Sequence, residues 1–403
     1  MAGSRYEDPK QSGIAHLLEH VILSGSKNYP NKLELSSLVD NFGGIANGQT
    51  RKEIVSFYVR ILATHIKEAL EYLSEAITKP LLSEKDIEIE KNRVLEEIKW
   101  RETDTLSQQF DKIIWGSNEP MGRPIIGTTP TVKALTKKDL EDFYQRFYVP
   151  RNMVIGIAGN YDLETTALLF EKLFNSFKDR QFSLPATNSS FQGGNLQIWI
   201  ERLASESTHV SLAFLTGIHN NHPDRRAMTM LMYYLFGGNT SPIHHKLLYE
   251  KGICYGVYGY TKPFSDTGIC TIESRHSHAN IFPFLADVIL GVRELKYRFL
   301  TDEQLNIAKQ KYKAWFLSQL DDNLASADET AYQELTLGKV FSPNEFSEII
   351  NAIKAKDIQR IAIEYFTKER MRLMLTNNRF GSIKLADVDE IINRAWDIKP
   401  SSA

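Results

Sequence analysis

The amino-acid sequence predicts an α+β protein built from two homologous α/β sandwich domains, each a mixed sheet with helices packed on it. Three observations lead to this prediction. The chain has 403 residues, more than a single hydrophobic core usually organises. Helical patterns such as residues 64–78 and 83–101 alternate with short β-rich segments such as residues 152–158. Parts of the first half also return in the second half.

The internal repeat has a constant spacing of 218 residues. Lys138-Asp139-Leu140 returns as Lys356-Asp357-Ile358, and Leu82-Ser83-Glu84 returns as Leu300-Thr301-Asp302. Because separate segments share one spacing, the repeat indicates a duplicated structural unit rather than coincidence.

Domain boundaries follow from a break in the periodic pattern between the two copies. Residues 183–195 contain Pro, Ser and Gly without helical or strand periodicity, and we interpret them as a linker. We therefore expect an N-terminal domain over residues 1–182 and a C-terminal domain over residues 196–403.

The second copy begins with two β-rich segments, residues 196–203 and 209–215, which the pattern predicts to be the two strands of a hairpin. Their counterparts 218 positions earlier would precede residue 1. We therefore expect the first domain to lack its N-terminal strands.

Composition excludes several classes of partner. The 48 Lys and Arg residues are balanced by 50 Asp and Glu residues, so the net charge of −2 gives no attraction to nucleic acid. No apolar run approaches the roughly 18 residues that a membrane span requires. The two cysteines and the lack of a leader pattern favour a cytoplasmic location of bacterial type.

The segment from His16 to His20 carries the strongest chemical signal. His16 and His20 are one helical turn apart, so both imidazoles can reach one Zn²⁺ ion at about 2.0–2.1 Å. Glu19 lies between them and can accept the proton of a metal-bound water, as in the inverted zincin pattern. On a helical wheel these three residues lie opposite the apolar stripe, which argues against an ordinary core role for the histidines.

Two histidines leave a catalytic zinc site short of a third protein ligand. The helix predicted after Ser83 is rich in glutamates, and the helical wheel reduces the choice. Glu90 and Glu97 flank its buried arc on one side, whereas Glu96 points to solvent. The helical pattern alone leaves Glu90 and Glu97 both open.

These motifs resemble the pitrilysin and insulinase metallopeptidases, a family that includes the mitochondrial processing peptidase and its bacterial homologues. The resemblance covers nearly the whole chain. Four segments carry it: residues 13–20, 43–47, 90–97 and 148–153.

The resemblance implies roles for the polar residues of the first copy. It implies that His16, His20 and Glu97 are the zinc ligands. Glu19 is then the general base, and Glu90 is a supporting acidic residue in the catalytic set.

The same resemblance implies how a peptide substrate is held. Asn47 and Gly48 would bind an extended peptide along an edge strand, with Asn47 holding the peptide; at position 48 the family usually has alanine. An alternative from local propensity is that Asn47-Gly48 forms a hairpin turn. In residues 241–255 the family usually has an arginine and, seven residues later, a tyrosine, both of which contact the bound peptide. In this chain the tyrosine is Tyr255, Leu248 stands seven residues before it, and Tyr249 occupies the apparent place of the arginine.

The second copy retains none of the proposed ligands. The positions 218 residues after His16, Glu19, His20 and Glu97 are occupied by Tyr234, Gly237, Gly238 and Trp315. We therefore expect an inactive C-terminal domain that helps to enclose the substrate.

Two functions remain open. The first is a zinc-dependent endopeptidase acting on peptides or extended protein segments, as a homodimer or with a homologous subunit. The alternative is a non-catalytic or partner-dependent peptide-binding subunit of a heterodimeric processing peptidase. The intact Glu19 favours the enzyme, because a purely structural zinc needs no general base and usually has four protein ligands.

Overall fold

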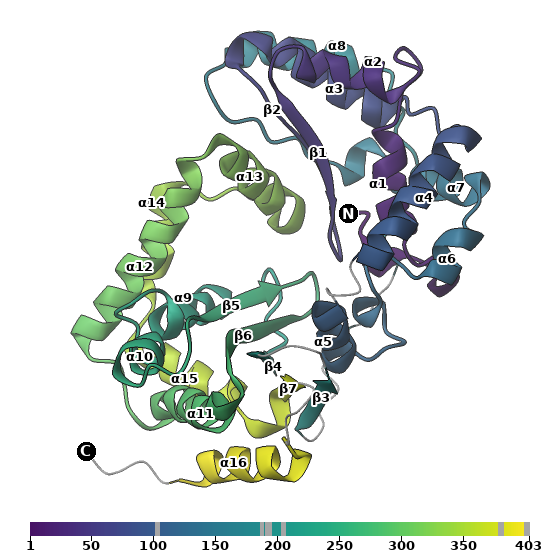
Figure 1. Cartoon of the computed structure of the whole chain (residues 1–403). Coiled ribbons are helices and arrows are strands. Elements are labelled where there is room, and N and C mark those ends of the chain that lie inside the picture. Colours follow the sequence, from purple (N-terminus) through teal and green to yellow (C-terminus); the bar gives the residue numbers. More distant parts are fainter. Residues whose placement is uncertain (101–104, 186–188, 190–195, 203–206, 378–382, 399–403) are drawn as a thin grey trace. The chain divides into compact units, whose positions relative to one another are not determined.

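The structure is a computed structural model that describes residues 1–100, 105–185, 189, 196–202, 207–377 and 383–398 (Figure 1). It divides into two compact units. Unit 1 comprises Met1–Thr187 and Leu320–Gly338, and unit 2 comprises Asn188–Gln319 and Lys339–Ala403. Most of the expected linker, residues 186–188 and 190–195, lies outside the described residues. Both units combine helices with strands, so the predicted α+β class is confirmed.

Unit 1 contains a two-stranded sheet and a set of helices joined by short 3-10 turns. Its elements are β1 (Ile45–Thr50), β2 (Val55–Arg60), α1 (Ile14–Ile22), α2 (Lys32–Asp40), α3 (Ile66–Thr78), α4 (Glu84–Trp100), α5 (Thr105–Trp115), α6 (Thr129–Ala134), α7 (Lys137–Phe147), α8 (Leu163–Phe174) and α13 (Asn323–Leu337). The predicted helices over residues 64–78 and 83–101 are thus present as α3 and α4.

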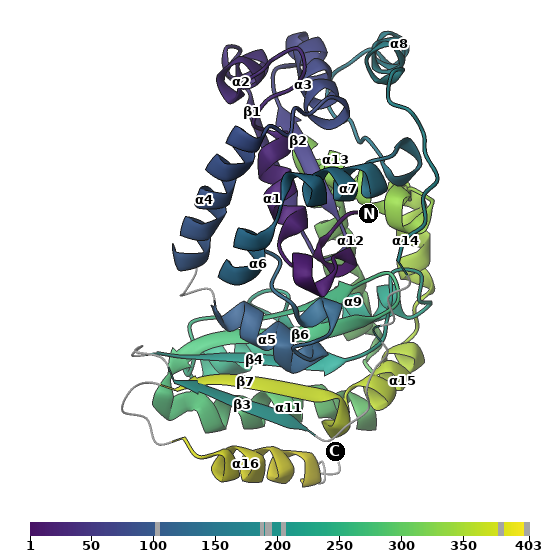
Figure 2. The ribbon, with the colours of Figure 1, turned by 90° about the vertical axis from the view of Figure 1, so that its right-hand side faces the viewer.

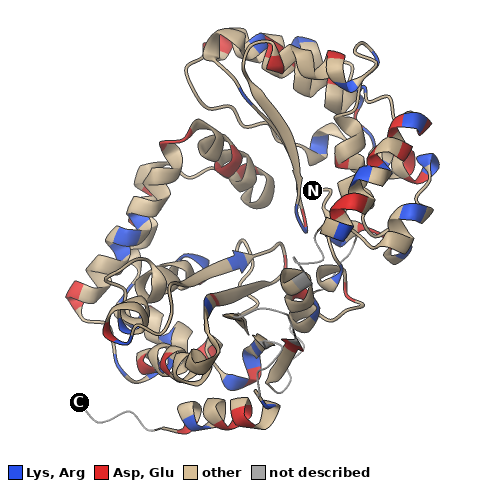
Figure 3. Cartoon of the chain, viewed as in Figure 1, with Lys and Arg blue, Asp and Glu red and all other residues tan. Residues whose placement is uncertain are grey.

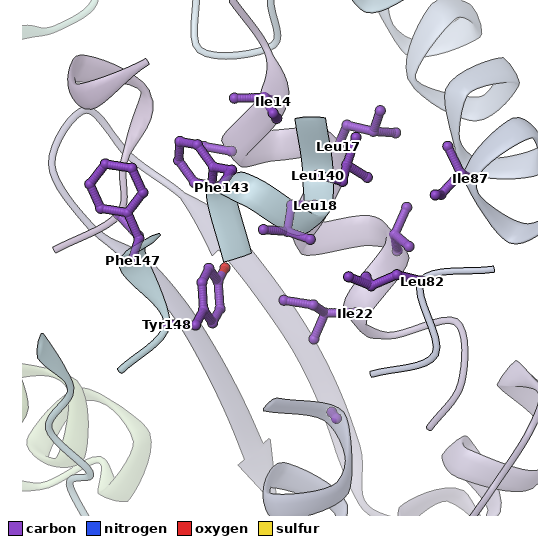
Figure 4. Packing of buried hydrophobic residues seen from close by; sticks show 14 of the residues in the cluster. Ile14, Leu17, Leu18, Ile22, Leu82, Ile87, Leu140, Phe143, Phe147 and Tyr148 are labelled. Carbon is purple, nitrogen blue, oxygen red and sulfur yellow. The ribbon is translucent and has the colours of Figure 1, made fainter. Parts of the chain in front are cut away.

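The apolar face of α1 forms the centre of the unit 1 core. Ile14, Leu17 and Leu18 are fully buried, and Figure 4 shows them beside Leu140 and Phe143 of α7. Because this face is fixed in the core, the opposite face of α1 presents its polar residues toward β1 and α4, two further elements that α1 contacts. The core therefore sets the orientation of the polar side chains of α1.

The start of α1 depends on a glycine and on a buried carboxylate. Gly13 has a φ of 97° and precedes the helix; a Cβ there would lie 2.7 Å from the carbonyl oxygen of Ile126. Glu7 accepts hydrogen bonds from the backbone N–H groups of Gly13 and Ala15, both at 3.0 Å. A carboxylate at this end of a helix satisfies otherwise unpaired N–H groups and interacts favourably with the helix dipole.

Strands β1 and β2 form an antiparallel hairpin. Its pairing places Asn47 opposite Tyr58 and Gly48 opposite Phe57. The chain reverses after β1, where the N–H of Arg51 donates to the carbonyl of Ile54 at 2.8 Å. The alternative that Asn47-Gly48 forms the turn is therefore wrong.

Unit 2 contains a five-stranded sheet and its helices. Its elements are β3 (Gln197–Arg202), β4 (Ser207–Leu215), β5 (Val257–Pro263), β6 (Gly268–Ser277), β7 (Met371–Asn377), α9 (Arg225–Phe236), α10 (Pro242–His245), the π-helical turn η7 (Lys246–Glu250), α11 (Ile281–Tyr297), α12 (Asp302–Leu320), α14 (Pro343–Ala352), α15 (Ala355–Tyr365) and α16 (Leu385–Asp397).

The strand order of this sheet is β3-β7-β4-β6-β5, with β3 parallel to β7 and the other pairs antiparallel. The sheet is therefore mixed, as predicted. Helix α11 packs against two other helices of unit 2, α15 and α16 (Figure 2). The predicted hairpin of residues 196–203 and 209–215 is wrong, because β7 lies between the two strands and pairs with both.

The predicted strand at residues 152–158 is also absent. Pro150–Asn152 is a 3-10 turn, and residues 153–158 join no sheet. Their counterpart in the repeat is β7, which has β3 and β4 on its two sides. In the described part of unit 1 no strand flanks residues 153–158, so their backbone groups have no neighbouring strand with which to form a ladder.

Charged residues of both signs are interspersed along surface helices such as α4 and α7 (Figure 3). This distribution agrees with the balanced composition. Over the part of the chain that the structure describes, no helix is both long and apolar enough to traverse a bilayer.

An ion pair connects the start of α9 to α15 in unit 2 and leads to a prediction on acid stability. Arg360 donates to both carboxylate oxygens of Asp224, and Tyr365 donates to one of them at 3.4 Å. The Arg360 hydrogen bond holds the pKa of Asp224 below its usual value of 3.8. The carboxylate therefore stabilises the fold above about pH 3.8, and this contribution is lost as the pH falls through the lowered pKa.

We expect Asp224→Asn to lower the free energy of unfolding by about 1–2 kcal/mol at pH 7, since one charge-assisted pair with a half-exposed arginine is lost. The deficit should shrink at pH 3. Denaturant titrations at both pH values measure it, with Glu364→Gln as the control, because Glu364 also pairs with Arg360 but is exposed. An equal deficit at pH 3 and pH 7 would contradict this account.

Candidate metal centre

Three side chains from α1 and α4 converge at one point in unit 1. Nε2 of His16 lies 3.7 Å from Oε2 of Glu97, and Nε2 of His20 lies 3.8 Å from the same oxygen. One potential ligand atom of each residue lies within 4.8 Å of the others. Within the described ranges, this is the one group of three or more His, Cys, Asp or Glu side chains with such a spacing.

The donor set fits a zinc ion. Ligand atoms at about 2.0–2.1 Å from a tetrahedral Zn²⁺ are about 3.4 Å apart, and the distances from Oε2 of Glu97 to the two imidazole nitrogens, 3.7 and 3.8 Å, are close to that value. Two imidazoles and one carboxylate leave a fourth position open, which is typical of catalytic zinc sites. The same side chains line a cavity of about 470 Å³, together with residues 47–50 of β1, Asp111 of α5 and residues 124–126.

Glu90 contacts the other nitrogen of His20. Its Oε2 lies 3.2 Å from Nδ1 of His20, and its Oε1 accepts a hydrogen bond from Ser24 at 3.0 Å. Glu90 is 1% exposed. Burial opposes its charged form, but hydrogen bonds from His20 and Ser24 and the charges of Lys32 and Arg93 outweigh burial, so the pKa of Glu90 is lowered. The structure thus places Glu90 and Glu97 on opposite nitrogens of the His20 ring.

Glu96 lies away from the cluster. Its side chain is 61% exposed and pairs with Lys99 at 2.5 Å. The helical wheel placed it toward solvent, and the structure agrees. Glu96 and Glu97 therefore form a natural pair for comparison, because they are adjacent acids of the same helix in different surroundings.

Glu19 is buried at the edge of the same cavity and is 6% exposed. Thr50 donates a hydrogen bond from Oγ1 to Oε2 of Glu19 at 2.6 Å. Burial raises the pKa of Glu19, and the hydrogen bond from Thr50 and the nearby His20 oppose this rise. A carboxylate with a raised pKa beside a cavity has the character of a general base.

The residues expected to bind peptide belong to both units. Asn47 and Gly48 line the cavity on β1, and the Asn47 side chain is exposed. Tyr255 belongs to unit 2, where it is 97% exposed in the segment before β5. Its contact with peptide stays a prediction.

Sequence reasoning missed Ser24 and Thr50 at this site, and Glu7 at the start of α1. Thr50 carried a usable signal, because residues two apart on a strand share a face and Gly48 was already a candidate. Ser24 lies one helical turn after His20 and donates to Glu90. Glu7 precedes Gly13 by six residues, too far for a standard helix-capping pattern.

Two family models match the chain and together span most of it. Residues 1–129 match the model described as Insulinase (Peptidase family M16), and residues 134–312 match the model described as Peptidase M16 inactive domain. The second match covers much of the copy that lacks the ligand residues.

Individual relatives point to the same family. An uncharacterized zinc protease of Streptomyces coelicolor is 28% identical over 369 residues, covering 89% of this chain and 80% of that protein. A protease structure from Helicobacter pylori superposes with a TM-score of 0.82 at 21% identity, covering 93% of this chain and 92% of that one. A Pseudomonas fluorescens structure titled peptidase M16 inactive domain has a TM-score of 0.80 at 17% identity, with 95% and 92% coverage. The chain therefore belongs to peptidase family M16, the pitrilysin and insulinase family of zinc proteases.

Proposed function

We propose that this chain is a zinc-dependent endopeptidase that hydrolyses peptides or extended protein segments. In this proposal His16, His20 and Glu97 hold the ion and Glu19 is the general base. The observation that carries the proposal is the convergence of the three ligand atoms within 4.8 Å on the wall of a cavity that Glu19 also lines.

A zinc ion held by these residues would supply Lewis-acid activation of a water and of the scissile carbonyl. Glu19 would take up the proton of the attacking water and pass it to the leaving amine. Its buried position suits this task, because burial raises its pKa and makes the carboxylate a better proton acceptor. Glu90 holds Nδ1 of His20 and so directs Nε2 toward Glu97.

The sheet edge of β1 supports the substrate class. Among the described strands β1 pairs only with β2, so its other edge is open. An extended peptide can add to such an edge through backbone hydrogen bonds, which require no particular side-chain sequence. Asn47 lies at this strand next to the cavity, in a position to hold the backbone of the peptide.

A second candidate function is a non-catalytic or partner-dependent peptide-binding subunit. The specific observation in its favour is the segment of residues 241–255, where the arginine that the family resemblance leads us to expect is missing: Leu248 stands seven residues before Tyr255, and Tyr249 occupies the apparent place of the arginine. A homologous subunit would then complete the peptide site. The first candidate includes assembly as a homodimer or with a homologous subunit, and the second requires a heterodimer. A cytoplasmic location remains part of the same proposal.

Metal removal and mixing test the two functions together. The purified chain is incubated with a quenched peptide mixture, alone and with a homologous chain encoded by the same genome. We expect hydrolysis to fall to background after chelation and to return with about one equivalent of Zn²⁺. Hydrolysis by the chain alone supports the first candidate, and hydrolysis only in the mixture supports the second. Hydrolysis that survives complete zinc removal would contradict both.

A further inference from the structure

We propose that Thr50 is a positioning residue that fixes the carboxylate of Glu19, and that Gly48 provides the space in which this carboxylate lies. This inference rests on the proposed function, because it deepens the role of Glu19 as the base. Neither residue is proposed to touch the reacting atoms.

The contact between Thr50 and Glu19 is short and sheltered. The Thr50 hydroxyl donates to Oε2 of Glu19 at 2.6 Å, within the range of hydrogen bonds to a charged oxygen. Because Glu19 is buried, water is a poor substitute for this donor.

Gly48 constrains Glu19 from the same face of β1. Residues 46, 48 and 50 are half-buried and alternate with exposed residues 45, 47 and 49, so Gly48 and Thr50 share the inward face. A Cβ at Gly48 would lie 2.6 Å from Cγ and 2.7 Å from Oε1 of Glu19. Gly48 is not among the glycines with positive φ, so the requirement is for space and not for backbone conformation.

These two contacts confine the base between α1 and β1. The side chain of glutamate has several rotatable bonds, and a carboxylate that swings away from its working position loses contact with the proton it must accept. One donor and one steric boundary on β1 restrict that motion. The strand that we propose carries the peptide therefore also sets the position of the base relative to it.

The test compares Thr50→Val with Thr50→Ser. Valine keeps the shape of threonine but removes the hydroxyl, and serine restores the hydroxyl. We expect Thr50→Val to lower kcat about 10- to 100-fold, with KM and zinc content unchanged, and Thr50→Ser to stay near the parent. Thr78→Val is the matched control, because Thr78 bonds only a carbonyl of its own helix. Thr50→Ala repeats the test if the valine variant does not fold.

Metal-free crystal structures of the parent and variants supply a readout that is independent of activity. We expect the Glu19 carboxylate to leave its position in Thr50→Val, to keep it in Thr50→Ser, and to be displaced in Gly48→Ala. An unmoved Glu19 in Thr50→Val, or a loss of zinc that accompanies the loss of kcat, would overturn the proposal. If the parent chain shows no hydrolysis in any mixture, the proposed function fails, and the position of Glu19 in these structures still decides the role of Thr50.

Discussion

Glu19→Gln is expected to remove peptide hydrolysis while zinc stays bound. Glutamine has nearly the shape of glutamate but cannot accept the proton of the attacking water. General acid–base catalysis contributes about 10²- to 10⁴-fold, so kcat should fall by at least about 100-fold. The ligand atoms of His16, His20 and Glu97 are untouched by this change, so metal analysis should find zinc content equal to that of the parent.

The control for this experiment is Glu96→Gln, which removes an exposed carboxylate outside the cluster. It should hydrolyse the same quenched peptide at the rate of the parent. If Glu19→Gln also retained that rate, another group would have to take the proton, and the assignment of Glu19 would be wrong.

Glu97→Gln is expected to have the largest effect on metal binding. The change replaces an anionic ligand atom that lies 3.7 and 3.8 Å from the two imidazole nitrogens with a weakly binding neutral amide. Loss of a group that only supports a ligand typically costs about 10- to 100-fold in affinity, so loss of a ligand should exceed about 100-fold. Competition with a zinc chelator of known affinity measures the change.

Glu96→Gln again provides the comparison, because it has the same chemistry one residue earlier on α4. Its zinc affinity should equal that of the parent. Equal affinities in Glu96→Gln and Glu97→Gln would show that α4 does not supply the third ligand through Glu97.

Local sequence patterns predicted which segments form helices and strands better than they predicted which strands pair in a sheet. The periodicity of α3 and α4 follows from which residues must be buried, and that information lies within each segment. Alternation in residues 196–203 and 209–215 correctly indicated strands, but it contains no information on pairing. Strand β7 lies more than 150 residues later in the chain and separates the two.

Two other differences between the predicted and the observed fold also arise from strand pairing. Residues 153–158 have the composition of a strand, but a strand requires a hydrogen-bonding neighbour, and none is present in the described part of unit 1. Asn47-Gly48 has the composition of a turn, but the register of β1 on β2 places it within a ladder. Tertiary pairing overrides local preference in each case.

The candidate site was predictable where its residues share one helix. The spacing of His16 and His20 defines a common face, and the wheel of α4 separated Glu96 from its neighbours. It did not separate Glu90 from Glu97, because both lie on the same side of α4. That distinction depends on how α4 crosses α1. Thr50 was missed because its contact with Glu19 depends on the approach of β1 to α1.

Helix α1 has a consequence for redesigning the cleavage preference. Eight of its nine residues are buried; one side of the helix lies in the core, and the other carries His16, Glu19 and His20 of the proposed site. The helix therefore offers almost no mutationally tolerant position, since a change on either side alters stability, chemistry or both. Residues 124–126 and the cavity-facing part of α5 border the same cavity without joining the metal cluster. Directed evolution of substrate preference is best begun in those segments.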